Sequence, residues 1–321
     1  MKWHAGLFNS HLTETAPTGI PTYRLTGTLA YRHTGSPAHD YLMQLDLAAA
    51  VLLSALLHAL WNSFVKVGSD RLASIAVISA TGAVLSAPVA ALVGWPAAAY
   101  LPFLAASVLT HLVYYYCLIN AYRFGDLSRV YPLARGLAPP VVAVGAAVVA
   151  GEWLDLREIV GIALVSCGIA SLIVGPSSAG DRRSLWFAVA TGGMIALYTI
   201  IDGLGARRAG RALSYIAWMN LFEGATLLLA ARVYRGRTLW PALRADLPRT
   251  VLAGSMATLG YGIVIYAMSR AAMAHVSALR ETSVVIAALI GTVVLGEPGA
   301  VARVAAAVVV AAGVIVMNWR G

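Results

Sequence analysis

Apolar runs of membrane-spanning length follow one another along most of the chain, and no other feature limits its possible folds so strongly. The runs lie near 46–66, 73–94, 101–123, 127–150, 156–175, 184–204, 212–232, 249–270, 274–296 and 300–319. A helix of about 20 apolar residues crosses the ~30 Å hydrocarbon core of a bilayer. Charged residues make up only 12 % of the chain, whereas a water-soluble domain carries about 25 %. The sequence therefore predicts an all-α integral membrane protein with ten transmembrane helices.

Two segments, residues 131–169 and 276–314, repeat one arrangement of polar and small residues. Each has an arginine early in an apolar run, a Gly-Glu pair where that run ends, and a late glycine in the next run. The matching positions, at a constant offset of 145, are Arg135 and Arg280, Gly151-Glu152 and Gly296-Glu297, and Gly168 and Gly313. Apolar residues coincide by chance, so the fixed spacing of the other positions indicates an internal duplication.

The duplication divides the ten spans into two groups of five. We expect a first repeat over 43–175, a linker over 176–183 and a second repeat over 184–321. Because five is odd, the second repeat must enter the membrane in the opposite sense, an arrangement that many secondary transporters use. Residues 1–42 contain no apolar run. We expect either a disordered tail or an upstream-start artefact there, because Met43 opens a conventional first helix.

Positive charge is concentrated in the loops between the spans, and the formal net charge is +9. Basic residues in such loops orient a membrane protein, whereas a nucleic-acid site gathers them on one soluble face. Loops on the side opposite the termini carry more Lys and Arg, especially 232–248. The charge distribution therefore predicts that this loop faces the cytoplasm and that Gly321 faces away from it. We expect no nucleic-acid partner, no metal and no cofactor.

Ionisable residues inside the spans are the best sequence signals of a functional site. A charged side chain at mid-membrane costs roughly 2.5–3.5 kcal/mol, so it needs a partner or a water-filled cavity. Arg135, Arg280 and Glu281 lie well inside their spans. We expect the two arginines to face a shared cavity and to bind substrate, with Glu281 as counter-ion or proton-coupling group. The alternative is that they form structural salt bridges or extend to the headgroups.

Polar and aromatic residues at helical spacing accompany these charges, and buried tyrosines need hydrogen-bond partners. We expect the substrate-binding site to include His58, Trp61, Asn62, Tyr116, Asn120, Tyr131, Tyr198 and Tyr261. Asp202 is ambiguous, because an ion pair with the nearby Arg207-Arg208 at the end of its helix fits equally well.

The stretch DGLGAR at 202–207 matches the opening of a signature found in CDP-alcohol phosphatidyltransferases, which are membrane-embedded enzymes. Those enzymes need further carboxylates to hold metal ions, and this chain has Ile216, Asn220 and Gly224 at the positions concerned. The sequence also contains no H-E-x-x-H, G-x-S-x-G or Walker motif. We therefore expect no enzymatic activity.

Over about residues 45–319 the chain resembles EamA-type members of the drug/metabolite transporter superfamily. The resemblance rests on HALWN at 58–62 and on the two apolar segments that end in Gly-Glu, each followed by a helix with a late glycine. It implies ten helices in two inverted halves, a central cavity, outward movement of small polar metabolites, and cytoplasmic termini. The second copy lacks the prolines of the first, Pro132, Pro139 and Pro140, so the halves are not equivalent.

The resulting hypothesis is a secondary transporter that exports a small polar metabolite by alternating access. Its expected partners are the substrate, protons, the lipid bilayer of a bacterial inner membrane and a second copy of the chain. The alternative is a flippase or a membrane enzyme acting on a lipid-linked substrate, which the Arg-rich 232–248 segment keeps open. A third possibility is a membrane partner subunit that transports nothing itself.

Overall fold

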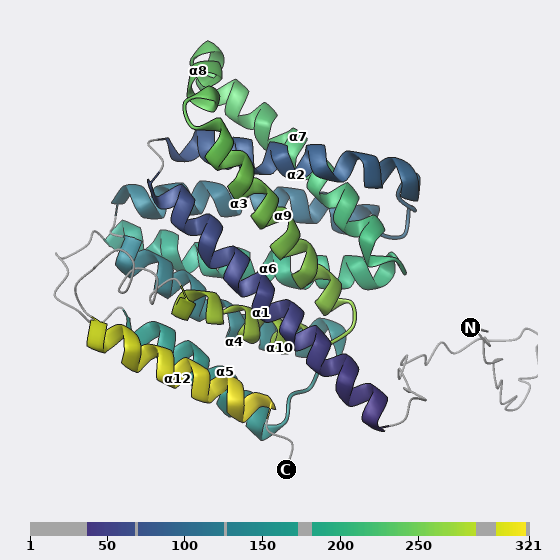
Figure 1. Ribbon diagram of the computed structural model, residues 1–321, viewed down its shortest axis with the longest axis vertical. Helices are drawn as coiled ribbons and strands as arrows, with labels where there is room; N and C mark the ends of the chain where they lie inside the picture. The colour runs from purple at the N-terminus through teal and green to yellow at the C-terminus, as the bar shows by residue number, and fades with distance from the viewer. Residues whose placement is uncertain (1–36, 68–69, 125–126, 173–181, 287–299, 319–321) are drawn as a thin grey trace, which may run out of the picture. The chain divides into compact units, whose positions relative to one another are not determined.

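The computed structural model describes residues 37–67, 70–124, 127–172, 182–286 and 300–318 (Figure 1). The chain divides after Tyr41, and residues 42–321 form one unit. The helices are α1 (Pro37–Val67), α2 (Arg71–Val93), α3 (Leu101–Phe124), α4 (Leu127–Ala150), α5 (Leu156–Ser171), α6 (Arg182–Arg208), α7 (Ala212–Arg235), the 3-10 helix η1 (Gly236–Thr238), α8 (Leu239–Arg244), α9 (Leu247–Met268), α10 (Met273–Arg280) and α12 (Ala300–Asn318). No strand occurs in these ranges, so the predicted all-α fold is confirmed for them.

Seven helices in the described ranges are long and apolar enough to cross a membrane. They are Leu45–Phe64, Arg71–Val93, Leu101–Phe124, Val130–Ala150, Arg182–Arg208, Ala212–Arg244 and Leu247–Met268. α5 has 16 residues, and the apolar part of α12, Val304–Met317, is also shorter than a full span. The chain is therefore a multi-pass membrane protein, with fewer full-length spans in the described ranges than the ten predicted.

Two predicted boundaries differ from the structure. α1 begins at Pro37, so the last residues of the predicted tail are helical, while residues 1–36 lie outside the described part. The predicted 232–248 loop is mostly helical, because α7 continues to Arg235 and is followed directly by η1 and α8. The predicted 176–183 linker lies outside the described residues up to the start of α6 at Arg182.

The predicted span at 274–296 contains an interruption at Glu281. α10 ends at Arg280, Glu281 forms a turn, and residues 282–286 are helical again. The Glu281 N–H donates to the Ala278 carbonyl at 3.1 Å, and the Val284 N–H donates to the Glu281 carbonyl at 3.0 Å. Both bonds join residues three apart, a tightening that often marks functional positions in helices. The rest of this span, 287–296, lies outside the described residues.

Small residues let several helices approach closely, as is common where lipid removes the hydrophobic drive for association. α5 and α12 lie side by side (Figure 1). A Cβ atom on Gly313 would lie 2.7 Å from the Gly161 carbonyl oxygen, and one on Gly168 would lie 3.2 Å from the Ala306 carbonyl oxygen. Glycine at these positions is therefore required by the helix–helix contact.

We expect Gly313→Ala to destabilise the protein by about 1–3 kcal/mol, the usual cost of overpacking. The added methyl group would meet the backbone of α5, at 2.7 Å from the Gly161 oxygen and 2.8 Å from the Val165 nitrogen. Thermal unfolding of the purified protein measures the effect. Gly193→Ala on α6 is the matched control, because no heavy atom lies within 4 Å of a Cβ there. Equal losses in both variants would contradict the packing explanation.

Asp70 begins α2 and connects it to the end of α7. Its carboxylate accepts a hydrogen bond from the Ala73 N–H at 3.1 Å and forms an ion pair with Arg235. Burial by itself would raise the pKa of Asp70. The hydrogen bonds from Arg235 and from the backbone, together with the charge of Arg235, outweigh burial and hold this pKa below its ordinary value.

A lowered folded-state pKa means that Asp70 stabilises the fold above its unfolded pKa of about 3.9. This contribution is lost as the pH falls through the lower folded pKa. We therefore expect Asp70→Ala to cost about 0.5–2 kcal/mol near neutral pH, the usual loss for a helix N-cap. The difference in unfolding temperature between wild type and variant should shrink below about pH 4. A difference that is independent of pH would show that the charge of Asp70 does not contribute.

Candidate functional site

Two arginines and one glutamate lie buried together where α4 meets the interruption after α10. Arg135 is 3 % exposed, Arg280 2 % and Glu281 0 %. The Arg135 Nε lies 2.8 Å from Oε2 of Glu281, and the Arg280 Nε lies 3.8 Å from Oε1 of the same carboxylate. These three residues, here called the arginine cluster, bring the matching arginines of the two sequence copies to one carboxylate.

The neighbours of the arginine cluster hold its side chains in place. The Arg135 Nη2 donates to the hydroxyl of Ser283, two residues beyond the break in the helix, at 3.3 Å. The Arg280 guanidinium lies 5.9 Å from the centroid of the Tyr261 ring, within the range of a cation–π interaction. Tyr198 packs edge-on against Tyr261, with ring centroids 5.7 Å apart.

Four other predicted site residues also lie near the arginine cluster. Tyr131, on α4, interacts electrostatically with Arg135, Arg280 and Glu281. His58 interacts electrostatically with both arginines from α1. The Trp61 Nε1 donates to the His58 Nδ1 at 3.2 Å, and the Asn62 amide donates to the His58 carbonyl at 2.7 Å. Trp61 and Asn62 therefore contact His58, which itself interacts with the arginine cluster.

The structure does not bring Tyr116 and Asn120 to this cluster. The Tyr116 side chain is 62 % exposed and its ring contacts Phe187. The Asn120 amide donates to the Tyr116 carbonyl at 2.8 Å. Successive residues of a helix point about 100° apart, so Tyr116 faces outward whereas Tyr114, two residues earlier, packs against Tyr198 with centroids 5.5 Å apart.

His111 belongs to the neighbourhood and was not predicted. It is 5 % exposed and stacks on Tyr198, with ring centroids 4.3 Å apart and an angle of 21° between the rings. It lies one turn before Tyr114 on the same face of α3. A histidine inside an apolar run is the same signal that identified His58, so the sequence did contain the information.

Asp202 is fully buried and is bound by tyrosines. It accepts hydrogen bonds from the hydroxyls of Tyr215 at 2.9 Å and Tyr261 at 2.5 Å. The predicted alternative, an ion pair with Arg207-Arg208 at a helix end, is wrong, because α6 continues to Arg208 and Arg207 pairs with Glu152 instead. Within the described residues Asp202 has no cationic partner, and it reaches the arginine cluster only through Tyr261.

The first Gly-Glu pair positions α10. Gly151 adopts a left-handed backbone with φ +67° directly after α4, a conformation that favours glycine. Glu152 then accepts a hydrogen bond from the N–H of Met273, the first residue of α10, at 2.8 Å. Its other oxygen pairs with Arg207 at 2.5 Å. This carboxylate therefore joins the ends of α4, α6 and α10 beyond the arginine cluster.

The arginine cluster is closed off from solvent. Its charged groups are shielded from solvent, whereas two small pockets at the surface lie elsewhere, between α2, α8 and α9, and are lined by residues such as Asp70 and Asp246. No group of three or more metal-binding side chains comes together in the part of the chain that the structure describes.

Comparisons with known proteins agree with a transport fold. Residues 182–319, almost the whole of the second predicted repeat, match the EamA-like transporter family. A solved structure titled only "Crystal structure of protein" aligns with a TM-score of 0.65, covering 87 % of this chain and 97 % of that one. The two sequences are 19 % identical, so the likeness shows a shared fold alone. A search of curated proteins found no match.

Proposed function

Because the chain belongs to the EamA-like transporter family of the drug/metabolite transporter superfamily, we propose that it is a secondary transporter working by alternating access. The observation that carries this proposal is the arginine cluster, in which matching residues of two sequence copies meet around one buried carboxylate. Ionisable residues inside a membrane protein mark substrate and ion pathways. The substrate is a small polar metabolite, moved outward across a bacterial inner membrane by a chain that pairs with a second copy.

The contact between α5 and α12 supports two inverted repeats of five spans. At the offset of the duplication, Gly161 corresponds to Ala306 and Gly168 corresponds to Gly313. The observed contacts are Gly161 with Gly313, and Gly168 with Ala306. Exchanging the two halves therefore converts each contact into the other, as a two-fold relation between repeats requires.

Alternating access needs contacts that close one side and then release. The ion pair between Arg207 and Glu152 is such a contact, because it joins helix ends from both proposed repeats. It is 31 % exposed at Arg207 and 13 % at Glu152, so water can reach it when the helices separate. Opening at this end breaks the ion pair and frees the start of α10, which carries Arg280 towards the opening.

Glu281 is the proposed proton-coupling residue. A proton on this carboxylate removes the charge that faces Arg135, and Arg135 is then free to bind substrate. Substrate and proton thereby act on the same buried ion pair, which links the transport of one to the movement of the other.

A flippase or an enzyme acting on a lipid-linked substrate is not supported by the basic 232–248 segment. In this segment Arg235 pairs with Asp70, and just beyond it Arg249 pairs with Asp246. These arginines stabilise the connection between helices and leave fewer charges for a lipid headgroup.

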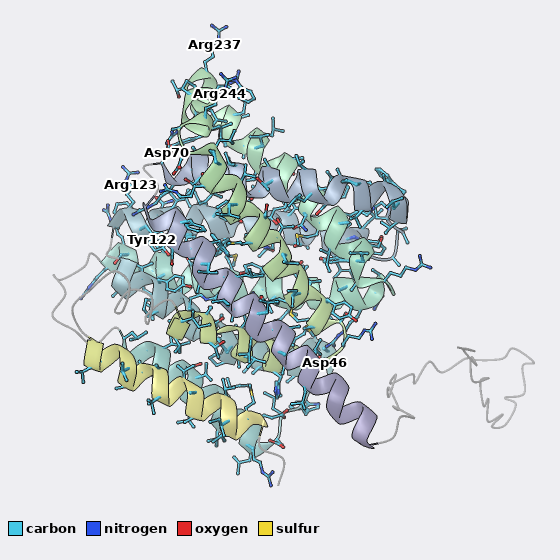
Figure 2. The ribbon with its side chains drawn as sticks, in the orientation of Figure 1. Asp46, Asp70, Tyr122, Arg123, Arg237 and Arg244 are labelled. Carbon is cyan, nitrogen blue, oxygen red and sulfur yellow. The ribbon has the colours of Figure 1, made fainter. Side chains whose placement is uncertain are left out.

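We propose that this basic end faces the cytoplasm. Figure 2 shows Arg237 and Arg244 at the same end of the helices as Asp70 and Arg123, whereas Asp46 lies towards the other end of α1. Basic residues favour the cytoplasmic side. A fluorescent reporter fused after Gly321 should stay dark, and a phosphatase active only outside the cytoplasm should work there. The opposite pair of results would show cytoplasmic termini, as the family resemblance implies.

Metabolite profiling of a deletion strain and an overexpressing strain tests the transport function. We expect at least one polar metabolite to accumulate in the deletion strain and to appear in the medium on overexpression. An overexpressed Arg280→Gln protein should not restore export. Unchanged internal and external profiles across all strains would contradict the proposal.

A further inference from the structure

We infer that the transported solute is an organic anion, bound by the free edge of the Arg280 guanidinium. This inference rests on the proposed transport function and names its substrate class.

The duplication supplies two arginines but only one carboxylate. At the position of Glu281 the first copy has Gly136, so Arg135 and Arg280 must share Glu281. A Cβ at Gly136 would lie 3.3 Å from both Ile169 Cγ2 and the Ser166 carbonyl oxygen, so a side chain there fits poorly. The absence of a second carboxylate therefore follows from the packing around Gly136. Both guanidinium groups stay charged at every physiological pH.

The Glu281 carboxylate lies closer to Arg135 than to Arg280. The ion pair distance is 2.8 Å to Arg135 and 3.8 Å to Arg280. The Arg280 Nε and Nη2 atoms are buried and make no hydrogen bond of normal geometry within the described ranges, although Nε faces Glu281 at 3.8 Å and the Tyr198 hydroxyl interacts with the same guanidinium. Buried polar groups in native proteins are almost always paired, so this weakly paired edge of Arg280 can donate to a further, anionic partner.

These two donors specify the chemistry of this partner. Nε and Nη2 form one edge of the guanidinium plane, which matches the two oxygens of a carboxylate or a phosphate. The rings of Tyr261 and Tyr198 lie beside Arg280, so the surroundings of this edge are aromatic. Asp202, the other buried carboxylate nearby, is occupied by Tyr215 and Tyr261 and does not reach this edge.

An isosteric series of probes separates charge from shape. The purified full-length protein is heated in detergent with benzoate, benzamide or benzamidinium at equal concentration and ionic strength, and with inorganic phosphate. We expect benzoate to raise the unfolding temperature by about 3 °C when it is well above its Kd. Benzamide and benzamidinium should not raise it. A response to phosphate that exceeds the response to benzoate would assign a phosphorylated substrate in place of a carboxylate.

Substitutions test whether the rise in unfolding temperature with benzoate depends on Arg280. Arg280→Gln should lose the benzoate shift and remain at least as stable as wild type without ligand, because the unpaired donors are removed. Arg280→Lys should keep a reduced shift, since it retains the charge without the two-pronged edge. Arg208→Gln, at an exposed position on the end of α6, should respond like wild type.

The inference is wrong if benzamide or benzamidinium stabilises as well as benzoate, or if neither benzoate nor phosphate has any effect. It is also wrong if vesicles containing the protein transport a neutral or cationic metabolite in an Arg280-dependent manner, a result that would leave the transport function standing. An Arg280-dependent benzoate shift without any transport would support the anion site and overturn the proposed function.

Discussion

Arg280→Gln is expected to reduce transport in reconstituted vesicles by about 10- to 100-fold, the effect of losing a hydrogen-bonded contact to a charged ligand. The structural reason is that Arg280 is 2 % exposed and two of its donors make no hydrogen bond of normal geometry, so its removal costs the 3.8 Å contact with Glu281 and the contact with the Tyr261 ring but leaves the closer Arg135–Glu281 pair in place. The purified variant should elute as a single folded species and should unfold no earlier than wild type.

Comparison of Arg280→Gln with Arg135→Gln separates binding from folding. Arg135 holds Glu281 at 2.8 Å and donates to Ser283. Breaking a buried ion pair from one side typically costs about 3–5 kcal/mol, so this variant should lose stability as well as transport. If Arg280→Gln is destabilised as strongly as Arg135→Gln, both arginines are structural and the assignment of Arg280 to the substrate fails.

Glu281→Gln is expected to retain exchange of substrate across vesicles but to lose accumulation driven by a pH gradient. The substitution mimics a permanently protonated carboxylate, so substrate binds while the proton cycle stops. Without ligand it leaves two buried guanidinium groups facing a neutral side chain, and we expect a loss of stability of about 3–5 kcal/mol. Benzoate should recover a large part of this loss, because its carboxylate replaces the missing charge.

Asp202→Asn is the matched control for coupling. Asp202 is the other fully buried carboxylate near the arginine cluster, and its described partners are the hydroxyls of Tyr215 and Tyr261. We expect this variant to keep accumulation driven by the pH gradient. If Asp202→Asn loses this accumulation while Glu281→Gln retains it, the proton is carried at Asp202 and Glu281 acts only as a counter-ion.

The sequence by itself determined the class of the protein and the most deeply buried part of its site. Long apolar runs and few charges leave lipid as the only suitable solvent, and this conclusion needs no tertiary information. The fixed spacing between the copies identified Arg135 and Arg280 as equivalent positions, and the energetic cost of charge in a membrane marked them with Glu281 as functional candidates. Those are the residues that the structure buries together.

Only the tertiary structure decided which side chains face that site. Helices in a membrane are apolar around their whole circumference, so their sequence pattern does not separate an interior face from a lipid face. Tyr114 and Tyr116 are the same residue type in the same apolar run. Only their tertiary packing distinguishes them, because Tyr114 packs against Tyr198 of α6 whereas Tyr116 is exposed. Likewise, Asp202 binds tyrosines because α7 and α9 pack against α6. The sequence suggested the nearby Arg207-Arg208 as partners instead. The break at Glu281 also depends on tertiary contacts, because no proline or glycine in 273–286 signals an interruption and the ion pair with Arg135 lies across two helices.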